Sequence, residues 1–168
     1  MLYFAYDADL FFTRFKAKMK TARVFDKGWV EGYGLKVNAR SHKDHSGKAN
    51  LEPSTEENAV VHGVIYKIGA DDKVILDRDH GLGYGFCEIA IKVRRPQAAP
   101  LFAFTYIANR QFVTPDLLAY TWYRDLMIEG AVQQGLPEAY IETYLKQIMA
   151  DIDPDNHRDD IHKKMMAS

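Results

Sequence analysis

The stretch Leu2-Tyr3-Phe4-Ala5-Tyr6-Asp7-Ala8-Asp9-Leu10 decides the fold of this chain. Large apolar side chains alternate along residues 2–6, so that every second one falls on the same face, and this pattern predicts a β-strand. A short polar turn with two carboxylates, Asp7 and Asp9, follows at the end of the strand. The chain therefore begins with a strand, and the turn at its end places backbone amides and two negative charges close together.

The two aspartates of the turn have two interpretations. Asp commonly ends a strand and caps the helix that follows it, which would give Asp9 a structural role only. If the turn is instead a binding loop, its negative charges repel a carboxylate at short range and favour a cation. The sequence leaves both interpretations open.

Composition indicates one soluble domain. The chain has 168 residues, 47% of them hydrophobic, which is enough to bury a sizeable core. Its net charge of -1 argues against a nucleic acid or a membrane surface as partner. We find no apolar run long enough to span a bilayer and no signal-peptide pattern, so we expect a cytoplasmic protein. The oligomeric state is not predicted.

A single cysteine, Cys87, excludes an internal disulfide. It falls on the apolar face of an alternating segment, so it is predicted to be a buried core thiol rather than a nucleophile.

Strand patterns fill the first two thirds of the chain. Residues 11–20 indicate a short helix or a turn, residues 28–38 indicate a strand pair or one strand with flanking turns, and strands are predicted at residues 60–68, 86–93 and 101–107. Many strands with helices set apart from them indicate an α+β fold.

Helical spacing fills the last third. Thr114 is predicted to cap a helix that has Pro115 at its first position and ends at Gly135. Pro137 is predicted to open a second helix that stops before Pro154. We assign residues 1–153 to one domain and residues 154–168 to a loosely held, charged C-terminal tail.

Short motifs in the right order resemble the gamma-glutamylcyclotransferase-like (AIG2-like) family. The opening strand is similar to the family's Tyr-Phe-Ala-Tyr, but Asp7-Ala8-Asp9 stands where the family has Gly-Ser-Asn. Further similar segments are Gly47–Asn50 with Pro53, Val60–Tyr66, Thr105–Tyr106, Gly130–Ala131, and Gly135–Pro137 with Tyr140. The chain is identified as a divergent member, and the resemblance implies a small mixed β-barrel with C-terminal helices packed against it.

The resemblance implies an internal acyl transfer that needs no cofactor. The α-amine of a γ-glutamyl amine or peptide attacks its own side-chain carbonyl, which gives 5-oxoproline and releases the amine. The family's base is a glutamate in a Leu-Asp-x-x-Glu-Gly stretch, and here the stretch reads Leu76-Asp77-Arg78-Asp79-His80-Gly81. His80 therefore occupies the catalytic position of this lyase or acyltransferase reaction.

Histidine has a pKa near neutrality, which suits proton transfer, but it lacks the negative charge that attracts an ammonium group. Asp7, Asp9 or Asp79 could restore that charge and orient the imidazole ring. By the same resemblance, the substrate-binding residues are Tyr6, Asp7, Ala8, Asp9, Leu10, Tyr84 and Tyr106.

Two function classes follow. The first is a cyclotransferase with His80 as its base. The second is a non-catalytic or repurposed relative, which binds a small cationic ligand or a protein partner, because both the loop glycine and the glutamate are replaced. No metal site is predicted, since His42 and His45 lie among residues that are typical of a loop.

Overall fold

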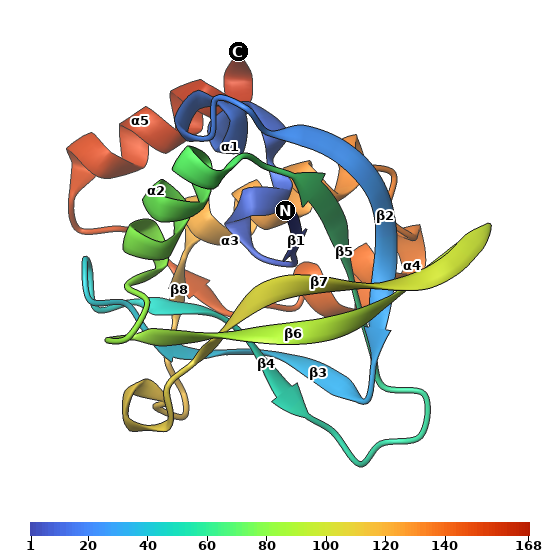
Figure 1. Cartoon of the computed structure of the whole chain (residues 1–168). Coiled ribbons are helices and arrows are strands. Elements are labelled where there is room, and N and C mark those ends of the chain that lie inside the picture. Colours follow the sequence, from blue (N-terminus) through green and yellow to red (C-terminus); the bar gives the residue numbers. More distant parts are fainter.

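A closed β-barrel forms the centre of the computed structural model, which describes residues 1–168 (Figure 1). Its five strands follow the order β1-β5-β2-β6-β7. Their bounds are Leu2–Ala5 (β1), Arg23–Glu31 (β2), Val60–Lys67 (β5), Phe86–Arg95 (β6) and Ala98–Ala108 (β7). Antiparallel pairs join most neighbours, and a parallel contact of Tyr3 with Phe104 closes the barrel. The α+β fold and the barrel are as predicted.

The opening strand β1 is buried on both faces, because neighbouring strands flank it and helices cover it. Tyr3 packs against Phe15 of helix α1 (Phe12–Lys18), with ring centroids 5.8 Å apart. On the other face, Phe4 meets β5 at Gly63, where an added Cβ would lie 2.3 Å from the Ala5 carbonyl oxygen. Both sets of alternating side chains therefore belong to the core, and β1 leads directly into the turn at Asp7.

Two small sheets extend the barrel. The first pairs β3 (Tyr33–Arg40) with β4 (Gly47–Pro53). The second pairs β8 (Ala119–Tyr120) with β9 (Ala150–Asp151) in parallel. The segment between β3 and β4 remains a loop, as predicted.

Several helices pack against the barrel (Figure 1). In addition to α1, they are the short turn η1 (Ala8–Leu10), α2 (Ala70–His80), η2 (Arg110–Phe112), α3 (Thr121–Gln133), α4 (Glu138–Tyr140) with the π-helical turn Ile141–Leu145, and α5 (Asn156–Ala167). Helix α2 was not predicted. It ends at Gly81, whose φ of +65° is the left-handed conformation that commonly terminates helices.

The predicted helix start at Thr114 is wrong. Helix α3 begins at Thr121, because the preceding residues are tied to the small sheets. The Thr114 amide donates to the Asn38 carbonyl, and the Leu118 carbonyl accepts from the Gly47 amide. Asp116 has a φ of 59°, which a helix does not allow. The helix does end before Gly135, as predicted.

The loosely held tail is also contradicted by the structure. Residues 156–167 form α5, and the Asp155 side chain caps it by accepting from the Arg158 amide. Buried Asp153 accepts two hydrogen bonds from the Arg158 guanidinium and a third from the Trp122 indole. These bonds fasten α5 to α3. The division of the chain after Asp153 stays a prediction.

None of the helices combines the length and the apolar character that crossing a membrane requires. Cys87 is half-buried rather than part of the core, because it lies near the beginning of β6, where the sheet is only partly covered.

Candidate functional site

A cavity of about 350 Å³ lies beside the turn that follows β1. Its walls come from the turn itself, α1, the end of α2, the loop between β3 and β4, the first residues of β4 and β6, and the helices α3 and α5. The cavity therefore collects residues from both ends of the sequence.

His80 is the last residue of α2 and lines this cavity. Its Nδ1–H donates to the carbonyl of Leu76, 3.2 Å away. The Tyr106 ring stacks on the imidazole with centroids 4.2 Å apart and an interplanar angle of 11°. Because the ring is held on its face and at one nitrogen, Nε2 is left to meet the turn at Asp7.

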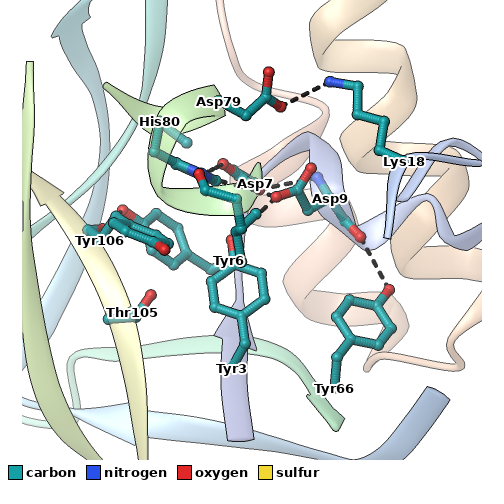
Figure 2. Close-up of polar contacts among 12 residues, drawn as sticks. Tyr3, Tyr6, Asp7, Asp9, Lys18, Tyr66, Asp79, His80, Thr105 and Tyr106 are labelled. Carbon is teal, nitrogen blue, oxygen red and sulfur yellow. Dashed lines mark hydrogen bonds and ion pairs between the residues drawn. The ribbon is translucent and has the colours of Figure 1, made fainter. Parts of the chain in front are cut away.

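The turn holds its two carboxylates in fixed positions (Figure 2). Asp7 caps η1 by accepting from the Asp9 amide at 2.9 Å, so the structural interpretation of Asp as a cap applies to Asp7. Asp9 is buried, accepts from the Tyr3 hydroxyl at 3.1 Å, and pairs with Arg14 at 3.2 Å. The Tyr66 hydroxyl donates to the Asp9 carbonyl at 2.9 Å. Asp7 can therefore cap η1 and still present its negative charge to the cavity.

The imidazole and both carboxylates meet at one point. His80 Nε2 lies 3.5 Å from Asp7 Oδ2 and 3.8 Å from Asp9 Oδ2 (Figure 2). Burial alone would lower the pKa of His80, but the hydrogen bond with Asp7 and the charges of Asp9 and Asp7 outweigh it and raise the pKa. We call Asp7, Asp9 and His80 the acid–base cluster.

The pKa values of the two carboxyl groups in the cluster shift in opposite directions. Burial would raise the pKa of Asp7, but its hydrogen bond with His80 and the charge of that ring lower it. Burial and the neighbouring charge of Asp7 raise the pKa of Asp9. The three groups therefore influence one another's titration, and a proton can be shared between the imidazole and the carboxylates.

Asp79 does not face His80. It pairs with Lys18 at 2.7 Å and with Lys43 at 2.6 Å, which ties α2 to α1 and to the loop between β3 and β4 (Figure 2). Although burial opposes ionisation, the two lysines hold the pKa of Asp79 well below its usual range. Its role is to fix the end of α2 beside the cavity.

Not all of the substrate-binding residues expected from sequence line this cavity. Asp7, Ala8 and Asp9 do. The other four lie elsewhere: Leu10 is fully buried, Tyr6 donates to the Tyr106 carbonyl in the core, Tyr106 supports His80, and Tyr84 is exposed. Their contact with a ligand stays a prediction.

Sequence reasoning missed the cationic and aromatic part of the wall. It comprises Arg14, Lys18, Lys48, Trp122, Tyr123, Arg158 and His162. Arg14 and Lys18 lie in the short helix predicted at residues 11–20, and Arg158 and His162 lie in the segment predicted to be a tail. The closely spaced basic residues of α1 were the available signal, but spacing alone does not show which of them face a cavity.

The acid–base cluster also has ligand atoms that a divalent cation could use. One atom from each of Asp7, Asp9 and His80 lies within 4.8 Å of the other two. Carboxylate oxygen and imidazole nitrogen are ordinary ligands for zinc and for manganese. No metal site is predicted from the sequence, which groups His80 with Asp7 and Asp9 only for proton transfer.

Comparison with known families points to one family. A profile of the AIG2-like family matches residues 60–144, which include β5, α2 and His80. A search of curated proteins found no match.

Solved structures share the whole fold. A protein named gamma-glutamyl cyclotransferase has a TM-score of 0.83 at 24% identity, over 97% of this chain and 98% of its own. An uncharacterized protein from Homo sapiens has a TM-score of 0.82 at 24% identity, over 96% of this chain and 97% of its own. A yeast gamma glutamyl cyclotransferase specific to glutathione has a TM-score of 0.57 at 13% identity, over 99% of this chain and 95% of its own. At these identities the similarity concerns the fold.

Proposed function

The chain belongs to the AIG2-like family, and from that premise we propose that it is a cytoplasmic cyclotransferase with His80 in place of the family's glutamate. Its substrate is a γ-glutamyl amine or peptide, and its products are 5-oxoproline and the released amine. The observation that carries this proposal is the position of His80, whose Nε2 faces two carboxylates inside a cavity of about 350 Å³.

The nucleophile and the carbonyl group that it attacks belong to the same substrate molecule. The α-ammonium loses a proton to neutral His80, and the freed amine nitrogen bonds to the γ-carbonyl carbon. The carbon–nitrogen bond to the leaving amine then breaks as that amine takes the proton from His80. The ring nitrogen gives its second proton to the imidazole, which is now neutral again, and the imidazole passes this proton to the released amine, so that the products are the 5-oxoproline lactam and an ammonium. The nucleophile is part of the substrate, so proximity replaces a second reactant. One group that accepts and then returns a proton is sufficient.

The surrounding residues supply what a lone histidine lacks. A glutamate base attracts the substrate's ammonium through its negative charge, whereas a neutral imidazole does not. Asp7 and Asp9 place that charge within 3.8 Å of Nε2, and the bond from Nδ1 to the Leu76 carbonyl keeps Nε2 as the proton-accepting nitrogen. The arrangement supports a rebuilt acid–base site.

The test is release of 5-oxoproline from a panel of γ-glutamyl amino acids, γ-glutamyl amines and glutathione. We expect release by the wild type and a loss of about a hundredfold or more in His80→Ala. His157→Ala is the matched control, because His157 is an exposed histidine on α5. Circular dichroism of each variant reports whether it is folded.

If the folded wild type releases no 5-oxoproline from any member of the panel, the cyclotransferase proposal is wrong. The alternative, a non-catalytic relative, then becomes the account to pursue. The two carboxylates of the turn favour a small cationic ligand for it, and calorimetry with simple amines and guanidines would follow.

A further inference from the structure

Arg14 lines the cavity with most of its hydrogen-bonding capacity unused. Its Nη1 pairs with Asp9 at 3.2 Å, and no other acceptor in the protein contacts the guanidinium. A guanidinium has five N–H donors in a planar fork that matches a carboxylate. Only 16% of the side chain is exposed, so its free donors point into a partly enclosed space.

Lys48 brings a second cation to the same cavity. Its Nζ lies 4.6 Å from the ring centroid of Tyr123 and 5.0 Å from that of Trp122, and it donates to Asp44 at 2.9 Å and to Ser46 at 2.6 Å. Burial lowers the pKa of Lys48 even though Asp44 opposes that shift, and the charges of Arg14 and Arg158 add to it. A further anion beside Lys48 would therefore be favourable.

His162 of α5 completes this part of the wall. Its ring stacks on Trp122 with centroids 3.9 Å apart, and its Nδ1 is buried without a hydrogen-bond partner. Burial lowers the pKa of His162 to about 4, and Arg14, Lys18, Lys48 and Arg158 contribute to that shift. Arg14, Lys18, Lys48 and Arg158 therefore lie close enough to disfavour the protonated ring, although each of the four also pairs with a carboxylate.

We propose that Arg14, Lys48 and His162 form an anion subsite that binds the α-carboxylate of the γ-glutamyl group. This inference rests on the proposed function, which places the α-amine at the acid–base cluster. The amine and the α-carboxylate share one carbon atom, so their two sites must adjoin. Arg14 meets that requirement, because it contacts Asp9, and Asp9 lies 3.8 Å from His80.

The subsite also compensates for the replacement of the family's binding loop in the turn. By resemblance, the family's Gly-Ser-Asn loop holds the glutamyl end of the substrate, and here that loop carries Asp7 and Asp9. Two carboxylates would repel the α-carboxylate unless cations stand beside them. Arg14 and Lys48 supply the cations, and α5 supplies the remaining wall. Recognition of the glutamyl end has moved from the backbone of a loop to side chains of α1, β4 and α5.

The test compares two amides that differ only in the α-carboxylate. γ-Glutamylmethylamide has it, and 4-aminobutyryl methylamide lacks it but closes the same five-membered lactam. We expect the wild type to favour the first by about tenfold to a hundredfold in kcat/KM, as for a hydrogen-bonded charge pair. Arg14→Gln and Lys48→Met should each reduce that ratio at least fivefold. Lys67→Met, an exposed lysine of β5, should not change it.

His162→Phe guards against misfolding as an explanation, because phenylalanine keeps the stacking on Trp122, and it should also reduce the ratio. Calorimetric binding of both amides to the His80→Ala variant needs no turnover. If neither amide forms a lactam but the first binds more tightly, the subsite stands and the proposed reaction fails. If the wild type neither turns over nor binds the first amide better than the second, the subsite is wrong. It is also wrong if the three variants keep the wild-type ratio.

Discussion

His80 Nε2 lies 3.5 Å from the Asp7 carboxylate, although these residues belong to distant segments of the chain. Strand β1 delivers Asp7, and the last turn of α2 delivers His80. The pairing matters because, by the resemblance described above, both residues differ from the family's motifs, one in the loop and one at the position expected to be catalytic. The two departures meet in space, which supports one rebuilt site rather than two unrelated losses.

The pH dependence of turnover should follow His80. As the base it must be neutral, so turnover should rise with pH through a pKa above the ordinary histidine value. Asp7→Asn removes a charge that raises this pKa, so the rising limb should move to lower pH. The pH profile of kcat/KM measures it, with Asp71→Asn at an exposed position of α2 as control. A limb that stays in place in Asp7→Asn contradicts the coupling.

Asp72 should be important for stability. It is buried on α2 and accepts hydrogen bonds from the Lys20 amide and from the amide and hydroxyl of Thr21. Asp72→Ala leaves these donors unpaired, so we expect the free energy of unfolding to fall by about 2–4 kcal/mol. Urea denaturation measures the loss. The neighbouring Asp71→Ala should change stability by less than about 0.5 kcal/mol, because that side chain is exposed. Equal effects of the two changes would refute the argument.

Gly130 should not tolerate a side chain. It lies where α3 crosses η1, and an added Cβ would stand 2.4 Å from the Leu10 carbonyl carbon and the Phe11 amide nitrogen. In an exposed helix Gly→Ala is stabilising, but here we expect Gly130→Ala to destabilise the protein by about 1–3 kcal/mol. Thermal unfolding tests this, with Gln133→Ala on the exposed face of α3 as control. An unchanged or raised Tm in Gly130→Ala would show that η1 can move away.

Removal of metal should not affect turnover. The acid–base cluster has ligand atoms within 4.8 Å of one another, but the proposed reaction uses His80 Nε2 as a free base. We therefore expect the same rate of 5-oxoproline release before and after treatment with a chelator. Loss of activity that zinc or manganese restores would instead make the cluster a metal centre.

The barrel could be predicted only through the family resemblance, whereas several of its strands are evident from their own sequences. β5 and β7 carry runs of apolar and β-branched residues, and β1 is recognisable from its first residues. Helix α2 could not be predicted, because only Asp72 and Leu76 of its side chains are buried and Val74 is 68% exposed. Because α2 has no stripe of buried apolar residues, its sequence does not show the helical period.

The site could be predicted only in part for a similar reason. The turn and His80 were accessible through their place in motifs, whereas Arg14, Lys48 and His162 converge only through tertiary structure. Helix α5 is largely polar, so its sequence is typical of a tail. The opposite error occurred at Thr114, where Thr-Pro-Asp is a good helix start locally, but the hydrogen bond from the Thr114 amide to the Asn38 carbonyl holds the segment out of the helix.

The most direct test of the account is the rate of 5-oxoproline release by purified wild type and His80→Ala, measured on the best substrate of the γ-glutamyl panel. The account predicts measurable release by the wild type and a loss of about a hundredfold or more in a folded His80→Ala. A His80→Ala variant that releases 5-oxoproline as fast as the wild type would contradict it, because the proton would then travel through another group.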